Sequence, residues 1–462
     1  MTVAIGNNGY MSSLTPLRVA VIGSGPAGIY AADALTRQER EPVAVDVLDR
    51  LPTPYGLVRY GVAPDHTKIK GVARTLRDIL EREQVRFIGG VEFGRHVTRE
   101  SLARSYDAVI YATGASVDRR LGVPGEDLAG SVAATDFVNW YCGHPDTEVE
   151  RFLLDAEEVA VVGAGNVAVD VTRILAKSAD ELAATDIPQP MLDILAASKI
   201  RRIHLLARRG PIQAKFTAPE LRGLGELDNA DVVVRPDQVD IDPNSEEMLG
   251  AARAARTNLR ILGEWARRVP EGRPRRIDVR FWSRPAAVLG TDRARGLRVE
   301  ATRLDSAGRV EGTGEYETLD TGMVFRSIGY MGVSLPGVPF DESGRTIPHA
   351  EGRVLDSDGI PLSGQYVAGW IKRGASGVIG TNKSDAAATV RSLLEDAPVL
   401  RAARTGEHVP VERLLEGSGA VVSDYSDWLA IDAAEADRAA ALGRGERVKL
   451  LGWDEYYDAI GR

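Results

Sequence analysis

Two glycine-rich turns hold the residues whose types and spacing point most directly to chemistry. The first, GSGPAG, follows the apolar run LRVAVI, and Asp49 closes the next apolar run about 20 residues later, as in dinucleotide-binding units. In such a GxGxxG turn the first glycine allows a tight turn, the second admits a pyrophosphate and the third lets a helix pack on a strand. The helix N-terminus then faces the pyrophosphate, and the acid accepts hydrogen bonds from a ribose diol. The predicted site comprises Gly23, Gly25, Pro26, Ala27, Gly28 and Asp49.

The second turn is the variant GxGxxA. It follows the apolar run EVAVV, and a later apolar run, RIHLLARRG, ends in two arginines where the first unit ends in an acid. A carboxylate there would repel a ribose 2′-phosphate, whereas paired guanidinium groups can bind it. The difference predicts FAD at the first turn and NADP(H) at the second. The predicted NADP residues from this pattern are Gly165, Asn166, Val167, Ala168, Arg208 and Arg209.

The elements that position these turns are those of two strand–turn–helix units. We expect a strand from Leu17, a helix over about 27–36 and a strand ending at Asp49, and a second such unit from Glu158 to about Lys177. The wide gap between the second turn and its arginines predicts a helical insertion around 191–198. A charged helical segment is expected within 245–276.

Two further apolar segments indicate how the units are joined. A strand over 106–114 reads as the exit from the first domain, and a strand and turn over 323–332 would return the chain to it. The predicted fold class is therefore α/β, with two Rossmann-like dinucleotide-binding domains and the NADP domain inserted in the FAD domain. The predicted limits are 1–115 and 325–462 for the FAD domain, with 1–15 a loose tail and 397–462 a C-terminal extension, and 116–324 for the NADP domain.

Composition excludes several function classes. The 462 residues carry 57 Lys and Arg against 66 Asp and Glu, a net charge of −9, which argues against a nucleic-acid partner. No apolar run reaches the length of about 20 residues that a membrane span needs. The single cysteine, Cys142, cannot form an internal disulfide, a redox pair or an iron–sulfur site, so redox chemistry needs a bound cofactor. We expect a cytoplasmic protein without a metal site.

One stretch has the opposite charge from the whole. Residues 253–276 hold eight arginines and two glutamates. Complementary charge mainly accelerates association, so this stretch predicts a docking face for an acidic protein partner. The candidate docking residues are Arg201, Arg202, Arg267, Arg268, Arg273, Arg275 and Arg276.

Five long motifs in series carry a family resemblance over about 16–396. They are LPTPYGLVRYGVAPDHTKIK, GVPGED, GAGNVAVDVTRIL, LLARRGPIQAKFTAPELR and AGWIKRGASGVIGTNKSDA. In this order they resemble the adrenodoxin-reductase type of NADPH–ferredoxin reductase. Among these, the chain resembles members without an appended iron–sulfur domain, because it lacks the cysteines. The resemblance implies a monomer.

The resemblance also implies further cofactor contacts. The glycine-rich turn before a helix from about Asn382 would face the flavin ring, where a helix N-terminus stabilises negative charge. The FAD residues implied are Leu57, Val97, Trp370, Gly377, Val378 and Ile379, besides Ala27 and Asp49. For NADP, Arg119, Glu220 and the shared Gly377 join the residues above.

His66 is the candidate for acid–base chemistry, since it follows Pro64 and Asp65 in a loop of family character. Hydride transfer needs no protein base, so the alternatives are a positioning or proton-relay role and a purely structural one. The family has a second carboxylate three residues after Glu220, but this chain has Gly223. If that carboxylate pairs with the histidine, the relay here is altered.

The predicted function is an FAD enzyme that takes hydride from NADPH and passes single electrons to a small acidic ferredoxin-type iron–sulfur protein. Thiol–disulfide flavoenzymes share the double turn but need a cysteine pair. An NADPH-dependent diaphorase or monooxygenase-like flavoenzyme remains an alternative. So does an electron-input subunit resembling the glutamate synthase small chain, although that chain carries cysteine-rich segments absent here.

Overall fold

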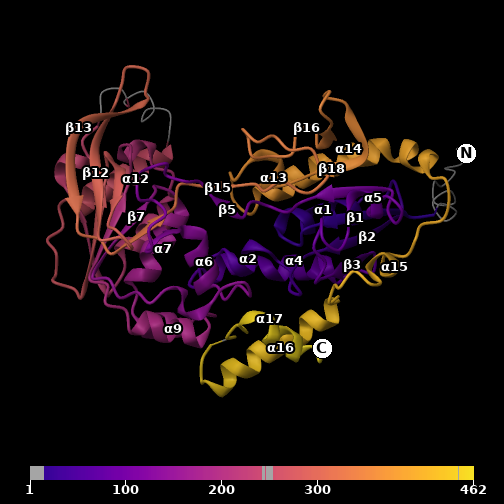
Figure 1. The fold of residues 1–462 in the computed structure, drawn as a ribbon, viewed down its shortest axis with the longest axis horizontal. Coiled ribbons are helices and arrows are strands. Elements are labelled where there is room, and N and C mark those ends of the chain that lie inside the picture. The colour runs from indigo at the N-terminus through magenta and orange to yellow at the C-terminus, as the bar shows by residue number, and fades with distance from the viewer. Residues whose placement is uncertain (1–14, 242–244, 246–252, 446) are drawn as a thin grey trace, which may run out of the picture.

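Two mainly parallel sheets lie side by side in the computed structural model, joined by a narrow two-stranded ribbon (Figure 1). The structure describes residues 15–241, 245, 253–445 and 447–462. The predicted α/β class is confirmed. Except for Thr15, the tail predicted over 1–15 lies outside the described residues, as does most of 242–252.

The first sheet carries the first glycine turn. Its order is β16 (His349–Ala350), β17 (Arg353–Leu355), β18 (Pro361–Val367), β4 (Ala108–Tyr111), β1 (Leu17–Ile22), β2 (Val43–Leu48) and β3 (Val85–Ile88). The strands from β18 to β3 run parallel, and β17 and β16 pair antiparallel at one edge. The central strands β1 and β4 are buried on both faces, which explains why they read as continuous apolar runs.

Helices cover this sheet and set the position of the turn. Helix α1 (Pro26–Arg37) packs along α14 (Thr381–Ala403), which begins where the sequence predicted a helix. Helix α4 (Val72–Leu80) lies against α1 as well. Shorter helices are α2 (Leu57–Tyr60), α3 (Thr67–Lys70), α5 (Arg99–Leu102) and α13 (Trp370–Arg373).

The second sheet carries the second turn and is parallel throughout. Its order is β6 (Ser131–Ala133), β14 (Met323–Arg326), β7 (Glu158–Val162), β8 (Arg202–Leu206), β10 (Arg275–Arg280) and β9 (Ala230–Val234). Its helices are α6 (Ala134–Tyr141), α7 (Asn166–Ala176), α8 (Ala179–Ala183), α9 (Gln189–Ala196), α10 (Ala218–Gly225) and α12 (Arg253–Trp265). Helix α9 is the predicted insertion, and α12 is the helical part of the charged segment.

A three-stranded antiparallel sheet packs on the second sheet. It consists of β11 (Ser283–Leu289), β12 (Gly296–Leu304) and β13 (Val310–Leu319). Its apolar residues Leu297 and Val299 share one core cluster with Val162 and Leu206 of the parallel sheet. The sequence analysis did not predict this sheet.

The ribbon between the domains pairs β5 (Val117–Asp118) with β15 (Tyr330–Met331). The predicted boundary between residues 324 and 325 falls inside β14, which pairs with β6 and β7 of the second sheet. The boundary at 397 falls inside α14, where Pro398 stands within the helix. We therefore propose that the chain crosses between domains at β5 and β15, and that the C-terminal extension begins after Ala403.

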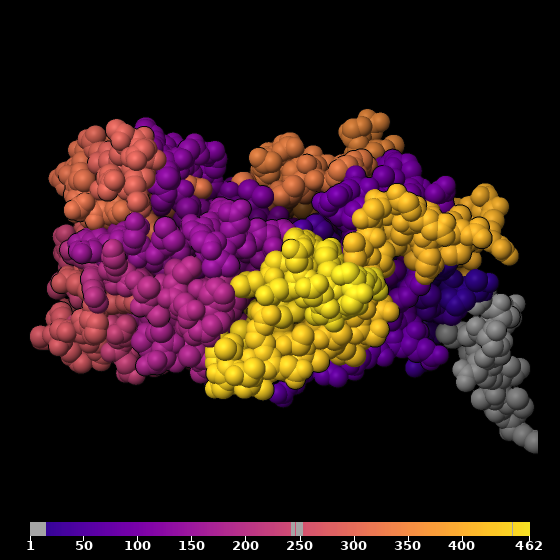
Figure 2. All heavy atoms as spheres, turned by 60° about the horizontal axis from the view of Figure 1, so that its bottom comes forward, coloured from indigo at the N-terminus to yellow at the C-terminus, as the bar shows by residue number. Residues whose placement is uncertain are grey.

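The C-terminal segment contacts both domains. It forms α15 (Val411–Leu415), α16 (Tyr425–Ala441) and α17 (Gly452–Ala459), which Figure 2 shows in yellow against both the magenta and the indigo-to-purple parts of the molecule. The Lys449 Nζ is buried and donates to the carbonyl oxygens of Arg59 and Cys142, each at 2.8 Å. Arg59 and Glu435, also buried, form a further ion pair between the first domain and α16. Among the described helices, none is long and apolar enough to cross a membrane.

Candidate active site

The first glycine turn can be built only with glycine at two of its positions. Gly23 has a φ of +109°, and a Cβ placed on it would lie 2.6 Å from the Ala112 carbonyl oxygen. A Cβ on Gly28 would lie 1.9 Å from the Gly23 carbonyl oxygen. The Gly28 contact packs α1 on β1 and its turn, and the Gly23 contact packs that turn on the residue after β4. This geometry fits the predicted close-packing and tight-turn positions.

Gly25 and Gly56 form a cradle above the start of α1. A Cβ on Gly56, whose φ is +49°, would lie 2.9 Å from the Gly25 Cα. Gly25 caps α1, no described side chain caps the helix, and no acid stands in its first turn. The free backbone N–H groups and the absence of a side chain at both glycines fit a pyrophosphate.

Asp49 stands at the end of β2, as predicted, and it also orders the turn. Its Oδ2 accepts from the Ser24 N–H at 2.7 Å and from the Ser24 hydroxyl at 2.6 Å, while Oδ1 accepts from the Leu51 N–H at 3.0 Å. Leu57 begins α2 directly after the cradle glycine. Val97 is 1% exposed and lies in the core cluster on the other face of the sheet.

The second part of the first site comes from the far end of the sequence. A Cβ on Gly369, whose φ is +80°, would lie 2.5 Å from the Ala27 Cβ, so the backbone before Trp370 contacts the start of α1. The Gly369 N–H donates to Asp385 of α14 at 2.6 Å. The N-termini of α1 and α14 therefore flank the same glycine. The Trp370 ring stacks on Tyr330 of the interdomain ribbon, with 5.7 Å between centroids.

The turn before α14 is open to solvent. Gly377 has a φ of +81°, Val378 is 65% exposed, and its N–H lies 3.2 Å from the Thr381 hydroxyl. Ile379 lies two residues before the helix and packs on the core of the first domain. An exposed turn with glycine backbone beside a helix N-terminus suits a flat anionic ring.

The second glycine turn repeats this construction. A Cβ on Gly163 would lie 2.0 Å from the Ser327 carbonyl oxygen, whereas one on Gly165, which caps α7, would meet nothing within 4 Å. Ala168 is fully buried, as the packing position requires. Asn166 accepts from the Thr217 N–H at 2.8 Å and so ties the turn to α10, and Val167 is partly buried beside it. The space at Gly165 fits a second pyrophosphate.

Three predicted NADP arginines have guanidinium groups with no ion-pair partner among the described residues. Arg208 is exposed and Arg209 half-buried, and both follow the carboxyl end of β8. Arg119 is exposed beside the ribbon, where its N–H donates to the Gly329 carbonyl at 2.9 Å. Unpaired guanidinium groups beside a glycine turn are available for phosphate.

The two domains meet at His66. Its Nε2 lies 2.8 Å from Asp170 Oδ1 of α7, 3.0 Å from Glu220 Oε2 of α10 and 2.7 Å from Arg173 Nη2. Arg173 also forms a two-point ion pair with Asp65, at 2.7 Å and 2.9 Å. Residues from the loop after α2 thus bind residues of the second domain in one buried charged cluster.

The charges in this cluster shift one another's pKa values. Burial opposes the charge of His66, but hydrogen bonds to Asp170 and Glu220 raise its pKa to about 9. Burial raises the pKa of Asp65, yet its bonds to Arg173 and the nearby Lys177 bring it well below its usual range. Burial raises the pKa of Glu220, but its hydrogen bond with His66 and the charges of His66 and Arg173 together lower that pKa below its usual value. His66 is therefore held as a cation near neutral pH.

Sequence reasoning missed Asp170 and Arg173. The two residues lie three positions apart on α7. Charged residues inside an apolar helix beside a nucleotide-binding turn are the sequence signal that could have identified them. Asp170 gives His66 a second carboxylate in addition to Glu220. A Cβ on Gly223 would meet nothing within 4 Å. The effect of Gly223 on the histidine relay stays a prediction.

One of the predicted docking residues is buried. Arg275 is 9% exposed and donates to the Lys177 carbonyl at 2.9 Å, so its assignment to a docking surface was wrong. Arg202 and Arg276 both pair with Asp278, and Arg273 pairs with Glu271. Arg202 is tied to the neighbouring strand β10, Arg276 pairs within its own strand, and Arg275 bonds to carbonyl oxygens at the end of α7. Sequence spacing alone does not reveal these contacts.

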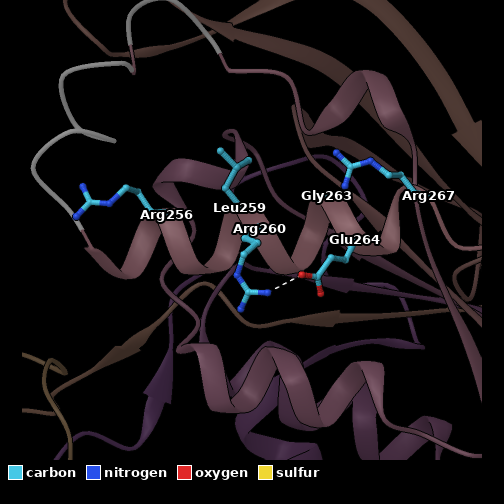
Figure 3. A pocket seen from close by; sticks show the side chains of 6 residues that line it. All are labelled: Arg256, Leu259, Arg260, Gly263, Glu264 and Arg267. Atoms are coloured by element: carbon cyan, nitrogen blue, oxygen red, sulfur yellow. Dashed lines mark hydrogen bonds and ion pairs between the residues drawn. The ribbon is translucent and has the colours of Figure 1, made fainter.

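Further exposed arginines lie on α12 and just after it. Figure 3 shows Arg256 and Arg260 on this helix and Arg267 just after it, around a surface hollow that also includes Leu259, Gly263 and Glu264. Arg260 pairs with Glu264 at 2.5 Å, and Arg268, one turn beyond, donates to the Gly225 carbonyl at 3.1 Å. Arg201 is exposed as well, but it precedes β8 at the amino end of the second sheet.

Comparisons with known proteins agree with this arrangement. Residues 17–220 match the family model described as pyridine nucleotide-disulphide oxidoreductase. The chain is 42% identical to NADPH-ferredoxin reductase FprA of Mycobacterium leprae, over 94% of this chain and 96% of that protein. It is 37% identical to the mitochondrial NADPH:adrenodoxin oxidoreductase of Arabidopsis thaliana, over 96% of each.

A solved structure, Mycobacterium tuberculosis FprA in complex with NADPH, matches with a TM-score of 0.90 at 40% identity, over 97% of this chain and all of that one. The fold and the two glycine turns agree with these matches, which cover most of the chain. The chain belongs to the adrenodoxin-reductase type of NADPH–ferredoxin reductases.

Proposed function

We propose that this protein is an FAD-containing NADPH–ferredoxin reductase, which takes hydride from NADPH and passes electrons singly to a ferredoxin-type iron–sulfur protein. The observation that carries the proposal is the pair of glycine turns on two domains joined at His66, one followed by Asp49 and the other by two unpaired arginines. The chain has a single cysteine, which is buried. It therefore lacks the cysteine pair that a thiol–disulfide reaction needs.

The first domain is proposed to bind FAD. Gly25, Pro26 and the free N–H groups of α1 receive the pyrophosphate in the cradle opposite Gly56, and Asp49 receives the ribose. Leu57, Val97 and Trp370 border the bound flavin. The turn from Gly377 to Ile379, with the N-terminus of α14, would border the flavin ring and favour negative charge on it through backbone N–H groups.

The second domain is proposed to bind NADPH. Gly165 to Ala168 receive the pyrophosphate at the N-terminus of α7, and Arg208 and Arg209 receive the 2′-phosphate. Arg119, directly after β5 of the ribbon, is proposed to bind a phosphate of the same dinucleotide. Glu220 and Gly377 border the nicotinamide end.

When bound, FAD supplies a two-electron acceptor for hydride and a one-electron donor for an iron–sulfur centre. The protein's part is to hold the two rings together and to control protons beside them. Protonated His66 donates from Nε2 to Asp170 or Glu220. Once that proton leaves, Nε2 can accept from Arg173 Nη2, which already lies 2.7 Å away. Both protonation states thus have a partner, and we propose a proton-relay and positioning role for His66.

The ferredoxin is proposed to be acidic and to dock over the basic side of α12. Arg260, Arg267 and Arg268 lie there, and Arg267 has no ion-pair partner among the described residues. Arg275, which is buried, lies outside this face. Complementary charge would increase the association rate and make it sensitive to salt.

We further propose a cytoplasmic monomer, on the basis of the cysteine content and the resemblance. A diaphorase or monooxygenase-like activity would leave the α12 arginines without a function, and a glutamate synthase type of subunit would need cysteine-rich segments.

The experiment is to purify the protein and to compare NADPH with NADH as donors, with ferredoxin as acceptor. The proposal requires bound FAD, a preference for NADPH and reduction of ferredoxin. A colourless protein that cannot be reconstituted with FAD would contradict it.

A further inference from the structure

The backbone of the arginine turn after β8 is held by the three-stranded sheet, which contributes no residue to either glycine turn. Three successive carbonyl oxygens of this turn accept hydrogen bonds from the three-stranded sheet and the residue before it. Ala207 accepts from the Ser283 N–H at 2.9 Å, Arg208 from the Thr302 hydroxyl at 2.9 Å, and Arg209 from the Trp282 N–H at 3.3 Å. The main chain that carries both arginines is therefore fixed on one side by β11, β12 and the residue before β11.

Trp282 forms the corner between β10 and β11 in an unusual conformation. Its φ is +55°, a left-handed backbone angle that bulky residues rarely adopt and that recurs at functional sites. Its carbonyl accepts from the Thr302 N–H at 2.9 Å. Its ring covers Gly210, the residue after the arginine pair, because a Cβ on Gly210 would lie 2.2 Å from the ring. The corner thus contacts the turn through both backbone and side chain.

Thr302 makes the one side-chain hydrogen bond of the three. It is 5% exposed, and its hydroxyl points from β12 to the Arg208 carbonyl. The guanidinium groups of Arg208 and Arg209 have no ion-pair partner among the described residues. Their direction therefore depends on how firmly the backbone beneath them is held.

We propose that the three-stranded sheet sets the preference for NADPH over NADH, with Thr302 and Trp282 as positioning residues for Arg208 and Arg209. The inference rests on the proposed function, since it assumes that these arginines bind the 2′-phosphate. Holding their backbone before the ligand arrives lowers the cost of ordering two long side chains on binding. The gain in affinity applies to binding of the 2′-phosphate and leaves binding of the rest of the dinucleotide unaffected.

The direct test is Thr302→Val, which keeps the shape of the side chain and removes its hydroxyl. Loss of one hydrogen bond predicts a rise of about three- to tenfold in KM for NADPH. The kcat with NADPH and the KM for NADH should stay within about twofold of the parent. Thr302→Ser keeps the hydroxyl and should restore the parent values. Thr313→Val removes a comparable bond, from an exposed hydroxyl to the Ala301 carbonyl at 3.1 Å, and should leave the ratio unchanged.

A second variant guards against simple misfolding. Gly210→Ala forces the Trp282 ring away and should produce the same selective loss for NADPH. FAD content and thermal unfolding of each holoprotein report whether the fold is intact. Calorimetry with 2′,5′-ADP and with 5′-AMP separates the phosphate contact from the rest, and only 2′,5′-ADP binding should weaken.

The outcomes distinguish this inference from the function on which it rests. If Thr302→Val and Gly210→Ala keep the parent ratio of kcat/KM for NADPH over NADH, while Arg208→Ala with Arg209→Ala lowers it, the sheet does not position the arginines and the inference is overturned. If the parent shows no preference for NADPH, the assignment of the arginines fails first.

Discussion

Arg173 and Asp65 form a two-point ion pair across the boundary between the two domains, with Nε to Oδ2 at 2.7 Å and Nη2 to Oδ1 at 2.9 Å. Both side chains are less than a tenth exposed. The pair lies directly beside His66, so one contact both joins the domains and borders the proposed site of hydride transfer.

Replacing Asp65 by Asn should therefore destabilise the protein. Removing one partner of a buried pair costs about 3–5 kcal/mol because the other charge stays buried. We expect the unfolding temperature of the holoprotein to fall by roughly 5 °C at pH 7. Since the pKa of Asp65 is lowered on folding, its contribution is present above the carboxyl's unfolded pKa and is lost only in acid. Asp305→Asn, which breaks the exposed pair with Arg309, is the control, and an equal fall for both variants would refute the role of burial.

His66→Gln should keep FAD bound while slowing its reduction by NADPH about tenfold or more, because glutamine cannot carry a proton at neutral pH. The parent rate should fall as pH rises through about 9, where His66 loses its charge, and the variant should lack this step. Stopped-flow absorbance from pH 6 to 10 measures both. Equal rates and equal pH profiles would exclude a relay role.

The same histidine links stability to pH. Its pKa is raised on folding from 6.5 to about 9, so its stabilising effect is fully present below pH 6.5 and disappears as pH passes 9. The gap in unfolding free energy between parent and His66→Gln should therefore shrink by a few kcal/mol, at about 1.4 kcal/mol per pKa unit, between these pH values. Denaturant unfolding at pH 6 and pH 9.5 tests this, and a constant gap would contradict it.

Arg208→Ala with Arg209→Ala should lower kcat/KM for NADPH by about a hundredfold, since each charged hydrogen bond contributes about 1.5–3 kcal/mol. The value for NADH should change little. Arg201→Ala removes an arginine from the opposite end of β8 and is the control. An unchanged ratio of the two donors would show that the pair does not read the 2′-phosphate.

Gly56→Ala should reduce FAD occupancy, because the new Cβ enters the cradle opposite Gly25. The ratio of flavin to protein absorbance measures this directly. Gly308→Ala introduces a similar backbone strain, at a φ of +72°, in a turn with open space, and should retain full flavin. Full occupancy in Gly56→Ala would place the pyrophosphate elsewhere.

Arg267→Glu should slow reduction of an acidic ferredoxin severalfold at low salt and much less at high salt, because screening weakens the charge contribution. The rate of electron transfer to ferricyanide, a small acceptor, should not show this salt-dependent decrease in the variant. Arg201→Glu is the matched charge reversal. A salt-independent rate in the parent would argue against α12 as the docking face.

The elements that the sequence predicted correctly are those whose pattern lies within a short stretch of the chain. The GxGxxG and GxGxxA turns, the helix before which Gly377 stands and the insertion around α9 all agree with the structure. Each depends on glycine geometry or apolar periodicity within a few tens of residues.

Features that depend on distant contacts were not predicted. Strand β13 is exposed along most of its length and has no apolar alternation, so the three-stranded sheet gave little signal. Asp170 reaches His66 across about a hundred residues, and Lys449 is buried although lysines are mostly exposed. The arginines near 275 lie close in sequence to exposed ones, but strand pairing buries Arg275.

Anaerobic rapid mixing of the yellow holoprotein with NADPH, and then with oxidised ferredoxin, tests directly whether the protein passes electrons from NADPH through FAD to ferredoxin. NADPH should bleach the flavin much faster than NADH, and the colour should return as two ferredoxins are reduced per NADPH consumed. A flavin that NADPH does not bleach, or a reduced flavin that ferredoxin does not reoxidise, would contradict the proposed function.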